Sequence, residues 1–386
     1  MKILVIPSWY PSKQSPIAGI FFKEQAKALN EYIDVSVLNL NRLSLRNPQN
    51  IFKRKRNNIK KENGNLLTLN KDYINWFPKL YFLSNKLYEN YLIKSYKKLV
   101  SEFGNPDIIH AHVTYPAGYG ALILSEKFNI PFLVTEHASF FETHILKYHK
   151  KITYKILKEA DKYTAVSSFL KNKIIDNGRE QCDITPNFIN FNRFENLELN
   201  EKFENNKFNL IHVSLMSEVK NIPLLLKSFQ KVVYEFNNKE IHLHLIGDGK
   251  RKKKYIELAK KLRINNHCTF HGRLSNDRVI SFMNKCDSLV ISSKKETFGV
   301  VGIEAMACGL PVISTKCGGP EDYITSNTGI LVENDNVRSL SNGIIEMLRN
   351  YSNYNSAFIK KYIKKNFSAR AVSHELISLY KQIISN

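Results

Sequence analysis

Long apolar runs are missing from this sequence. No stretch approaches the roughly 20 consecutive apolar residues that a helix needs to cross a bilayer. The first residues, Met1 to Pro7, fit a short strand, and no apolar region with a cleavage site follows them, as a signal peptide would require. We therefore expect neither a membrane-spanning segment nor a secretory leader.

Cysteine is also scarce, with five residues in a chain of 386. The number is odd and no Cys-x-x-Cys pair occurs, so the sequence favours neither a disulfide framework nor a zinc site. A reducing, cytoplasmic environment is expected. We expect small buried side chains at these positions, which are Cys182, Cys268, Cys286, Cys308 and Cys317.

Acidic residues are few, since 57 basic and 35 acidic side chains leave a formal charge of +22. Such an excess suits nucleic acid, an anionic membrane or an anionic substrate. The sequence has no Cys/His finger and no RNA-binding aromatic motif, so no nucleic-acid partner is expected. A biased base composition of the gene could also account for part of the excess. The basic runs are Lys53–Arg56, Lys250–Lys254 and Lys360–Lys365.

The length and the pattern of apolar runs predict two α/β domains. The first is expected over 1–190, with a C-terminal helix at about 369–386, and the second over 191–368. The first begins with a strand at Lys2–Ile6, a helix at Phe21–Asn30 and a strand at Val35–Leu40. The polar residues 41–65 are expected to form an exposed connection.

Residues 287–323 carry most of the functional information. Apolar runs at Leu289–Ile291 and Pro311–Ser314 predict buried parallel strands, and Val300–Cys308 between them predicts a short helix. The loop before that helix, with Glu296, then lies at the carboxyl edge of the sheet. Ligands of open α/β sheets bind at this edge.

The residue types in this loop suit a sugar nucleotide. Two carboxylates, Glu296 before the helix and Glu304 inside it, can accept hydrogen bonds from hydroxyls at opposite ends of one ligand. A surface Glu296 and a structural Glu304 remain the alternative. Amide groups at a helix start suit a phosphate, and a glycine lets the backbone approach it closely. The residues expected to do so are Phe298, Gly299, Val300 and Val301.

This segment resembles the signature of the family 4 retaining glycosyltransferases. It reads Glu296-Thr-Phe-Gly-x4-Glu304-Ala-Met-Ala-x-Gly-x-Pro-Val-Ile, followed by Gly318-Gly319-Pro320-Glu321. The resemblance implies the GT-B fold: two Rossmann-like α/β domains facing each other across a cleft, with a C-terminal helix that returns to the first domain. It also implies a nucleotide-sugar donor such as a UDP-sugar.

By this resemblance, several residues of the second domain would bind the donor. Lys220 would contact the diphosphate, whereas Leu215 stands where the family has an arginine, so half of the expected cationic clamp is missing. Arg273 or a nearby lysine is the expected substitute. Glu304 would hold the ribose. The remaining donor-binding residues would be Arg273 and Leu274 near the nucleobase, Gly318 and Gly319 near the phosphates, and Gly247.

The first domain would contribute a glycine and two histidines. Gly19 precedes a helix start and would lie near the diphosphate. The strands 107–112 and 132–137 both end in a histidine at the carboxyl edge of the sheet. The resemblance places His137 beside the donor sugar and His112 in the acceptor pocket; purely structural histidines are the alternative. Neither is spaced as a metal ligand.

The resemblance also implies the chemistry. Glu296 and His137 would be the catalytic residues, with Glu296 holding sugar hydroxyls, and the acceptor would attack on the face that the diphosphate leaves. The nucleotide sugar is a co-substrate, and no other cofactor is expected. No Asp-x-Asp motif is found in a strand-end context, so we also expect no obligatory metal.

A glycan or lipid-linked acceptor is expected, in bacterial surface polysaccharide or glycoconjugate synthesis at the inner face of the cytoplasmic membrane. The segment Trp76–Val100 mixes aromatic residues and lysines, as interfacial helices do. A helix that covers the sheet with snorkelling lysines fits it too. The alternatives for function are a sugar-nucleotide epimerase and a non-catalytic or nucleic-acid-binding protein of the same fold.

Overall fold

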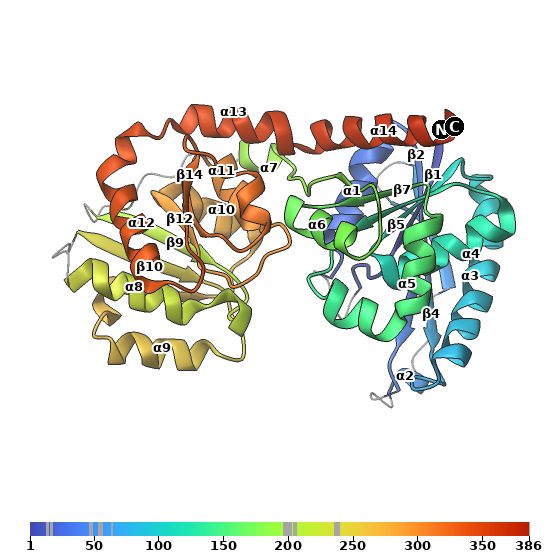
Figure 1. Cartoon of the computed structure of the whole chain (residues 1–386), viewed down its shortest axis with the longest axis horizontal. Coiled ribbons are helices and arrows are strands. Elements are labelled where there is room, and N and C mark those ends of the chain that lie inside the picture. The colour runs from blue at the N-terminus through green and yellow to red at the C-terminus, as the bar shows by residue number, and fades with distance from the viewer. Residues whose placement is uncertain are drawn as a thin grey trace. The chain divides into compact units, whose positions relative to one another are not determined.

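The computed structural model describes residues 1–12, 15, 18–45, 49–52, 57–62, 65–195, 203, 207–234 and 240–385. The chain divides into two compact units (Figure 1). The first comprises Met1–Val166, Leu170–Thr185 and Val372–Asn386, and the second comprises Ser167–Phe169 and Pro186–Ala371. The expected domain limits, 1–190 and 191–368, remain a prediction. The basic run 53–56 lies outside the described residues.

The first unit is built on an eight-stranded sheet with the order β3-β4-β2-β1-β5-β6-β7-β8. All neighbouring strands are parallel except β3, which runs antiparallel to β4. The central strands are buried on both faces, which explains why they read as continuous apolar runs. The strands are β1 Lys2–Pro7, β2 Asp34–Leu43, β3 Asn57–Glu62, β4 Leu66–Ile74, β5 Ile108–His112, β6 Phe132–Glu136, β7 Lys162–Ala165 and β8 Asp183–Ile184.

Helices cover this sheet (Figure 1). They are α1 Ile20–Asn30, α2 Gln49–Phe52, α3 Tyr81–Phe103, α4 Tyr119–Phe128, α5 Lys147–Glu159, α6 Ser168–Asp176 and α14 Ala369–Ser385. Short π-helical turns at Thr114–Gly118 and Phe141–Leu146 precede α4 and α5. No helix in the described part of the chain is long and apolar enough to cross a bilayer.

The expected exposed connection over 41–65 is wrong in part. Residues 57–62 form β3, which pairs along its whole length with β4. Because β3 ends the sheet, most of its side chains are half-buried or exposed, and its lysines fit the charged character of edge strands. That polarity is what made the segment look like a loop. Residues 46–48, 53–56 and 63–64 lie outside the described residues.

The C-terminal helix returns to the first unit, as the resemblance implied. Residues from Val372 onward in α14 belong to this unit, and Tyr380 is fully buried there. The Tyr380 hydroxyl lies 2.7 Å from His110 Nδ1 on β5, and His110 Nε2 lies 2.7 Å from Thr135 Oγ1 on β6. Burial lowers the pKa of His110 to about 3. A neutral imidazole therefore links the last helix to the centre of the sheet.

The second unit has a six-stranded sheet with the order β11-β10-β9-β12-β13-β14, parallel throughout. Its strands are β9 Phe208–Val213, β10 Ile241–Ile246, β11 Cys268–Gly272, β12 Ser288–Ile291, β13 Val312–Thr315 and β14 Gly329–Val332. Its helices are α7 Asn192–Glu195, α8 Ile222–Tyr234, α9 Lys252–Lys261, α10 Asn276–Lys285, α11 Val300–Ala307, α12 Val337–Asn350 and α13 Ser356–Phe367. An apolar cluster from α8, α9, α12 and the strands fills its core.

The link through Tyr380 leads to a stability prediction. We expect Tyr380→Phe to lower the free energy of unfolding by about 1–3 kcal/mol, because it leaves buried His110 Nδ1 without its partner. Calorimetric unfolding measures this. Tyr32→Phe, at a half-exposed tyrosine of the same unit, is the matched control and should change little. Equal transition temperatures for Tyr380→Phe and the wild type would contradict the role of this hydrogen bond.

Candidate functional site

The turn between β12 and α11 is held by close backbone packing. Gly299, at the start of α11, has a left-handed φ of 79°, and its carbonyl oxygen accepts a 2.8 Å hydrogen bond from the Tyr323 hydroxyl. A Cβ on Gly319 would lie 2.2 Å from the Cα of Phe298, so only glycine fits there. The structure thus brings the Gly318-Gly319 pair and the start of α11 together.

Glu296 is fixed to the same strand end by its backbone. Its N–H donates to the carbonyl oxygen of Cys317 at 2.8 Å, and its own carbonyl oxygen accepts from Gly319 N at 3.0 Å. Glu296 and Gly318 therefore pair as an isolated parallel bridge beyond the end of β13. This pairing sets the direction of the Glu296 side chain.

That side chain meets Lys220. Lys220 Nζ lies 2.5 Å from Glu296 Oε1, and the Ser293 hydroxyl donates to the same oxygen at 2.6 Å. The Ser292 hydroxyl donates to the carbonyl oxygen of Lys220 at 2.9 Å and so ties the Lys220 loop to the end of β12. The lysine expected at the diphosphate and the glutamate expected at the sugar are therefore neighbours.

A buried histidine lies behind this pair. His212 on β9 contacts the carbonyl oxygen of Val290 through Nδ1 at 2.9 Å and the Ser214 hydroxyl through Nε2 at 2.8 Å. Burial lowers the pKa of His212 to about 4, so the ring is neutral at pH 7. The charge of the site comes from Lys220 and Glu296 and not from this imidazole.

Glu304 lies about one turn inside α11. Burial raises the pKa of its carboxyl to about 7, and the positive charge of Arg193 on α7 opposes part of that rise. A carboxyl with such a pKa changes its charge close to neutral pH. Strongly shifted groups of this kind are common in functional sites, although structural groups show them too.

The loops after β9, β10 and β11 pack against one another. A Cβ on Gly247 would lie 1.8 Å from the Ser214 carbonyl oxygen, so this glycine is required for the packing of the two loops. Arg273 is exposed and Leu274 is half-buried at the end of β11. Leu215 is 68% exposed. Arg251 reaches the Leu215–Lys220 loop and pairs with Glu218 at 2.6 Å, so the structure brings this cation to that loop. The expected role of Arg273 stays a prediction.

In the first unit, the two predicted histidines contact each other. His112 Nδ1 lies 3.1 Å from His137 Nε2, and the Phe22 ring stacks on His112 at 4.7 Å. His137 is half-buried, whereas His112 is only 1% exposed, and burial holds the pKa of His112 well below its usual range. As the structure stands, His112 supports the ring of His137 and offers little surface to an acceptor.

A buried carboxylate fixes the loop that carries His137. Glu136 accepts hydrogen bonds from the N–H groups of His137 and Ala138, at 2.8 and 2.7 Å, and from Thr114 N at 2.9 Å. The Thr114 hydroxyl also donates to it. Burial raises the Glu136 pKa, and these donors counteract the rise. The loops after β5 and β6 are thereby held together.

Gly19 starts α1 in a left-handed conformation, with a φ of 69°. A Cβ there would lie 2.3 Å from the carbonyl oxygen of Trp9, so the loop after β1 folds back tightly on itself. This close approach is a structural reason for the glycine. Its expected contact with a diphosphate stays a prediction.

The sequence reasoning missed Glu136, Ser293, His212 and Arg193. The first three lie at or near strand ends, next to residues that were noted, and strand-end position was the available signal. Nothing in the sequence connects Arg193 with Glu304, because 111 positions separate them. Among the described residues, no group of three or more His, Cys, Asp or Glu side chains could hold a metal ion.

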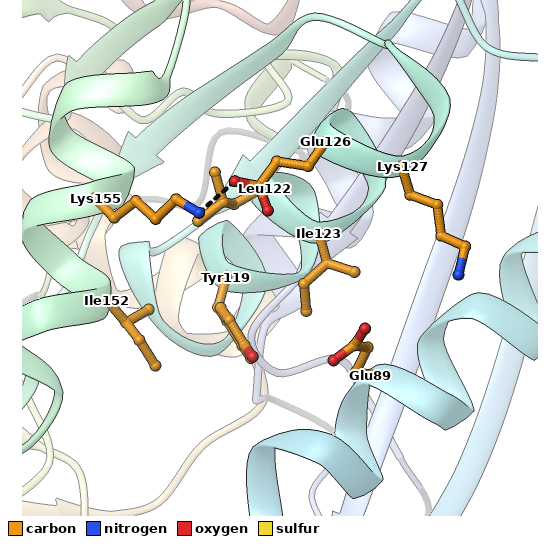
Figure 2. Close-up of a pocket in the computed structure, with 8 residues that line it drawn as sticks. All are labelled: Glu89, Tyr119, Leu122, Ile123, Glu126, Lys127, Ile152 and Lys155. Atoms are coloured by element: carbon orange, nitrogen blue, oxygen red, sulfur yellow. Dashed lines mark ion pairs between the residues drawn. The ribbon is translucent and has the colours of Figure 1, made fainter. Parts of the chain in front are cut away.

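A hollow of about 390 Å³ lies elsewhere, between α3, α4 and α5 of the first unit (Figure 2). Its floor is apolar, with Leu122, Ile123 and Ile152, and its rim carries the Lys155–Glu126 ion pair. None of the predicted site residues lines it. In each unit the candidate residues therefore lie at the carboxyl edge of its own sheet and not in this hollow.

Two family models together cover most of the chain. The model described as Glycosyltransferase Family 4 matches residues 27–193, and the model described as Glycosyl transferases group 1 matches residues 194–365. These models confirm the resemblance read from Glu296 to Glu321.

Individual relatives agree. The chain is 34% identical over 267 residues to an uncharacterized glycosyltransferase, MJ1178, of Methanocaldococcus jannaschii, covering 68% of this chain and 71% of the relative. It is 30% identical over 264 residues to N-acetyl-alpha-D-glucosaminyl L-malate synthase of Bacillus anthracis, covering 65% and 67%.

Solved structures show the same fold. Sucrose-phosphate synthase from Thermosynechococcus elongatus superposes with a TM-score of 0.74 at 18% identity, over 100% of both chains. HepE from Anabaena in complex with UDP superposes with a TM-score of 0.73 at 17% identity, over 99% of this chain and 100% of the other. The chain has the GT-B fold and is a glycosyltransferase that belongs to family 4, the glycosyl transferases group 1.

Proposed function

We propose that the protein is a retaining glycosyltransferase that moves a hexose-type sugar from a UDP-linked donor to a glycan or lipid-linked acceptor. The acceptor would belong to bacterial surface polysaccharide or glycoconjugate synthesis, at the inner face of the cytoplasmic membrane. The Lys220–Glu296 pair beside the glycine-bounded start of α11 is the observation that carries the proposal.

Several relatives agree with this class of reaction. HepE was solved with UDP and with UDP-glucose. A lipopolysaccharide outer core galactosyltransferase, WaaB, superposes with a TM-score of 0.73 at 18% identity. A putative teichuronic acid biosynthesis glycosyltransferase of Bacillus subtilis is 23% identical over 361 residues. These proteins support a nucleotide-sugar donor and a surface-glycan acceptor for the present chain.

The leaving group determines what the second unit must do. As the bond between the anomeric carbon and the diphosphate oxygen breaks, negative charge grows on the diphosphate, and preorganised donors stabilise it best. Lys220 and the amides at the start of α11 are the groups we assign to this charge. In this scheme the donor diphosphate would replace Glu296 as the partner of Lys220.

The hydroxyl groups of the donor sugar would then donate hydrogen bonds to the Glu296 carboxylate. An acceptor hydroxyl attacks the anomeric carbon on the face that the diphosphate leaves, the new carbon–oxygen bond forms, and a diphosphate oxygen takes the acceptor proton. His137 would lie against the sugar, held by His112 and by the hydrogen bonds of Glu136 to its loop. No carboxylate nucleophile is needed in this scheme.

The alternative of a non-catalytic protein of the same fold rests on Leu215. This exposed side chain occupies the position where the family has a cation for the diphosphate. A thermal-shift panel with UDP-sugars, GDP-sugars, the free nucleotides and free sugars separates the two. A donor at 100 times its dissociation constant should add roughly 2.7 kcal/mol of stability. If none of the nucleotide sugars raised the unfolding temperature, the proposed function would be overturned.

The raised pKa of the Glu304 carboxyl leads to a prediction about how donor binding depends on pH. With a pKa of about 7, this carboxyl is mostly protonated at pH 6 and mostly ionised at pH 8. If the carboxylate accepts the ribose hydroxyls, the donor dissociation constant should fall about tenfold between these pH values. Titration calorimetry with a UDP-sugar measures this, since its diphosphate diester does not titrate in that range. Glu304→Gln should abolish the slope, and exposed Glu257→Gln should keep it; a slope that survives Glu304→Gln would assign the titration to another group.

The two glutamates should separate binding from turnover. We expect Glu296→Ala to lower kcat about a hundredfold or more, with little loss of donor affinity, because the change also releases Lys220 for the diphosphate. Glu304→Ala should instead weaken donor binding about tenfold or more. Steady-state kinetics with calorimetric donor binding distinguishes the two effects. If both variants kept wild-type activity, this site assignment would be withdrawn.

A further inference from the structure

The segment that follows β4 exposes an unusual run of large apolar side chains. Trp76 is 51% exposed and Phe82 is 76% exposed, and both lie within eight residues of the end of β4. The other exposed apolar residues of this run are Phe77, Leu80, Tyr81 and Leu83. Monomeric proteins rarely leave such a contiguous cluster uncovered without a function.

The run is held with its side chains outward. Asn75 is buried; its Oδ1 accepts from Phe77 N at 3.0 Å, and its Nδ2 donates to the Ser84 hydroxyl at 2.6 Å. Both ends of the turn are thereby fixed to the body of the unit. The exposed rings belong to an ordered turn and the first turn of α3, and so present a defined surface.

This surface adjoins the loop that follows β5. The Tyr115 hydroxyl donates to Asn85 Oδ1 at 2.8 Å, the Tyr115 ring stacks on His149 at 3.6 Å, and the Tyr81 ring meets His149 edge-on at 5.4 Å. Tyr115 is the neighbour of Thr114, which bonds to Glu136 beside His137. The exposed run therefore lies at the same sheet edge as the expected acceptor end of the site.

Other loops at this edge are also apolar. Since β1, β2, β4, β5 and β6 are parallel, the segments that follow them emerge at one edge of the sheet. Phe52, in the segment after β2, is 87% exposed. We use the name apolar rim for ten exposed apolar residues in the segments after β2, β4 and β6, which are Ile51, Phe52, Trp76, Phe77, Leu80, Tyr81, Phe82, Leu83, Phe140 and Tyr148.

The charge around the rim is positive. No acidic residue occurs between Trp76 and Tyr88. Between Phe140 and Lys155, Glu142 is the single acid, and it is paired with Lys173. The exposed lysines of the two stretches are Lys79, Lys86, Lys147, Lys150 and Lys151, together with Lys155, which is paired with Glu126. Lysines next to tryptophan and tyrosine rings match the negative surface and the interfacial layer of an anionic bilayer.

The later turns of α3 do not take part. Tyr88, Leu92, Tyr96 and Leu99 are buried against the first unit, as expected for a helix that covers its sheet. Of the two interpretations left open for Trp76–Val100, the covering helix therefore holds for its second half. The interfacial character belongs to the rim.

We propose that the apolar rim docks on an anionic lipid surface, with Trp76 and Phe82 in the headgroup layer and the surrounding lysines on the lipid phosphates. This docking rests on the proposed function and names its partner: it brings the acceptor end of the site to the membrane, where a lipid-linked acceptor presents its hydroxyl. A second copy of the chain is the competing occupant, and the test includes it.

The test is sedimentation of the full-length protein with lipid vesicles, at low and at high salt. One set of vesicles contains phosphatidylcholine alone, and the other also contains about 30% phosphatidylglycerol, which approximates the anionic content of a cytoplasmic leaflet. We expect binding to the anionic vesicles that weakens with salt. The variant Trp76→Ser/Phe82→Ser should bind about tenfold more weakly or worse. Phe358→Ser, at an exposed ring of the second unit, is the matched control and should bind like the wild type.

Three outcomes would overturn the proposal: no binding of the wild type at low salt, equal binding of the double variant, or a wild-type dimer that dissociates in the double variant without any lipid binding. Donor affinity, measured by calorimetry, should be unchanged in the double variant, since neither ring belongs to the donor site. Lipid binding without donor binding would contradict the proposed function and leave the docking surface standing. Donor binding without lipid binding would contradict the docking surface and leave the proposed nucleotide-sugar donor standing.

Discussion

The backbone contact between Glu296 and Gly318–Gly319 is the constraint on which the candidate site of the second unit depends. The loop after β12 and the segment after β13 can approach this closely only because glycine occupies position 319, where a Cβ would collide with the Cα of Phe298. The contact fixes where Glu296 leaves the sheet, and it brings the Gly318 region to the start of α11. Tyr323 completes it with its hydrogen bond to the carbonyl oxygen of Gly299.

The electrostatics of the site follow from this geometry. Lys220 and Glu296 come from loops after different strands, and each would be costly to bury without a partner. The ion pair and the Ser293 hydroxyl fix the position of the Glu296 carboxylate. A sugar diphosphate offers a substitute for both, with phosphate oxygens for the lysine and hydroxyl groups for the carboxylate. The pair therefore matches the two kinds of group that the proposed donor carries.

The sequence was most informative in residues 287–323, where glycines and a proline interrupt the apolar runs of the strands. The run 287–323 predicted both strands and the helix between them, because apolar runs, glycines and a proline mark these features directly. It did not predict that Gly319 packs on the backbone of Phe298. It could not predict that Glu296 would pair with Lys220 or that Arg193 would approach Glu304, since such contacts depend on how distant loops pack. The strand β3 was missed for a related reason: an edge strand exposes most of its side chains and therefore lacks an apolar pattern.

The two units use their charges differently, and this bears on the excess of basic residues. In the second unit, Lys220 in the loop after β9 is paired with Glu296, and Arg251 is paired with Glu218 of the same loop, so both cations already have an acidic partner. Around the apolar rim of the first unit, exposed lysines greatly outnumber acids. A base-composition bias alone would scatter lysines without regard to aromatic side chains. Their concentration beside exposed rings at one sheet edge is therefore the observation behind the proposed docking of the apolar rim on an anionic surface.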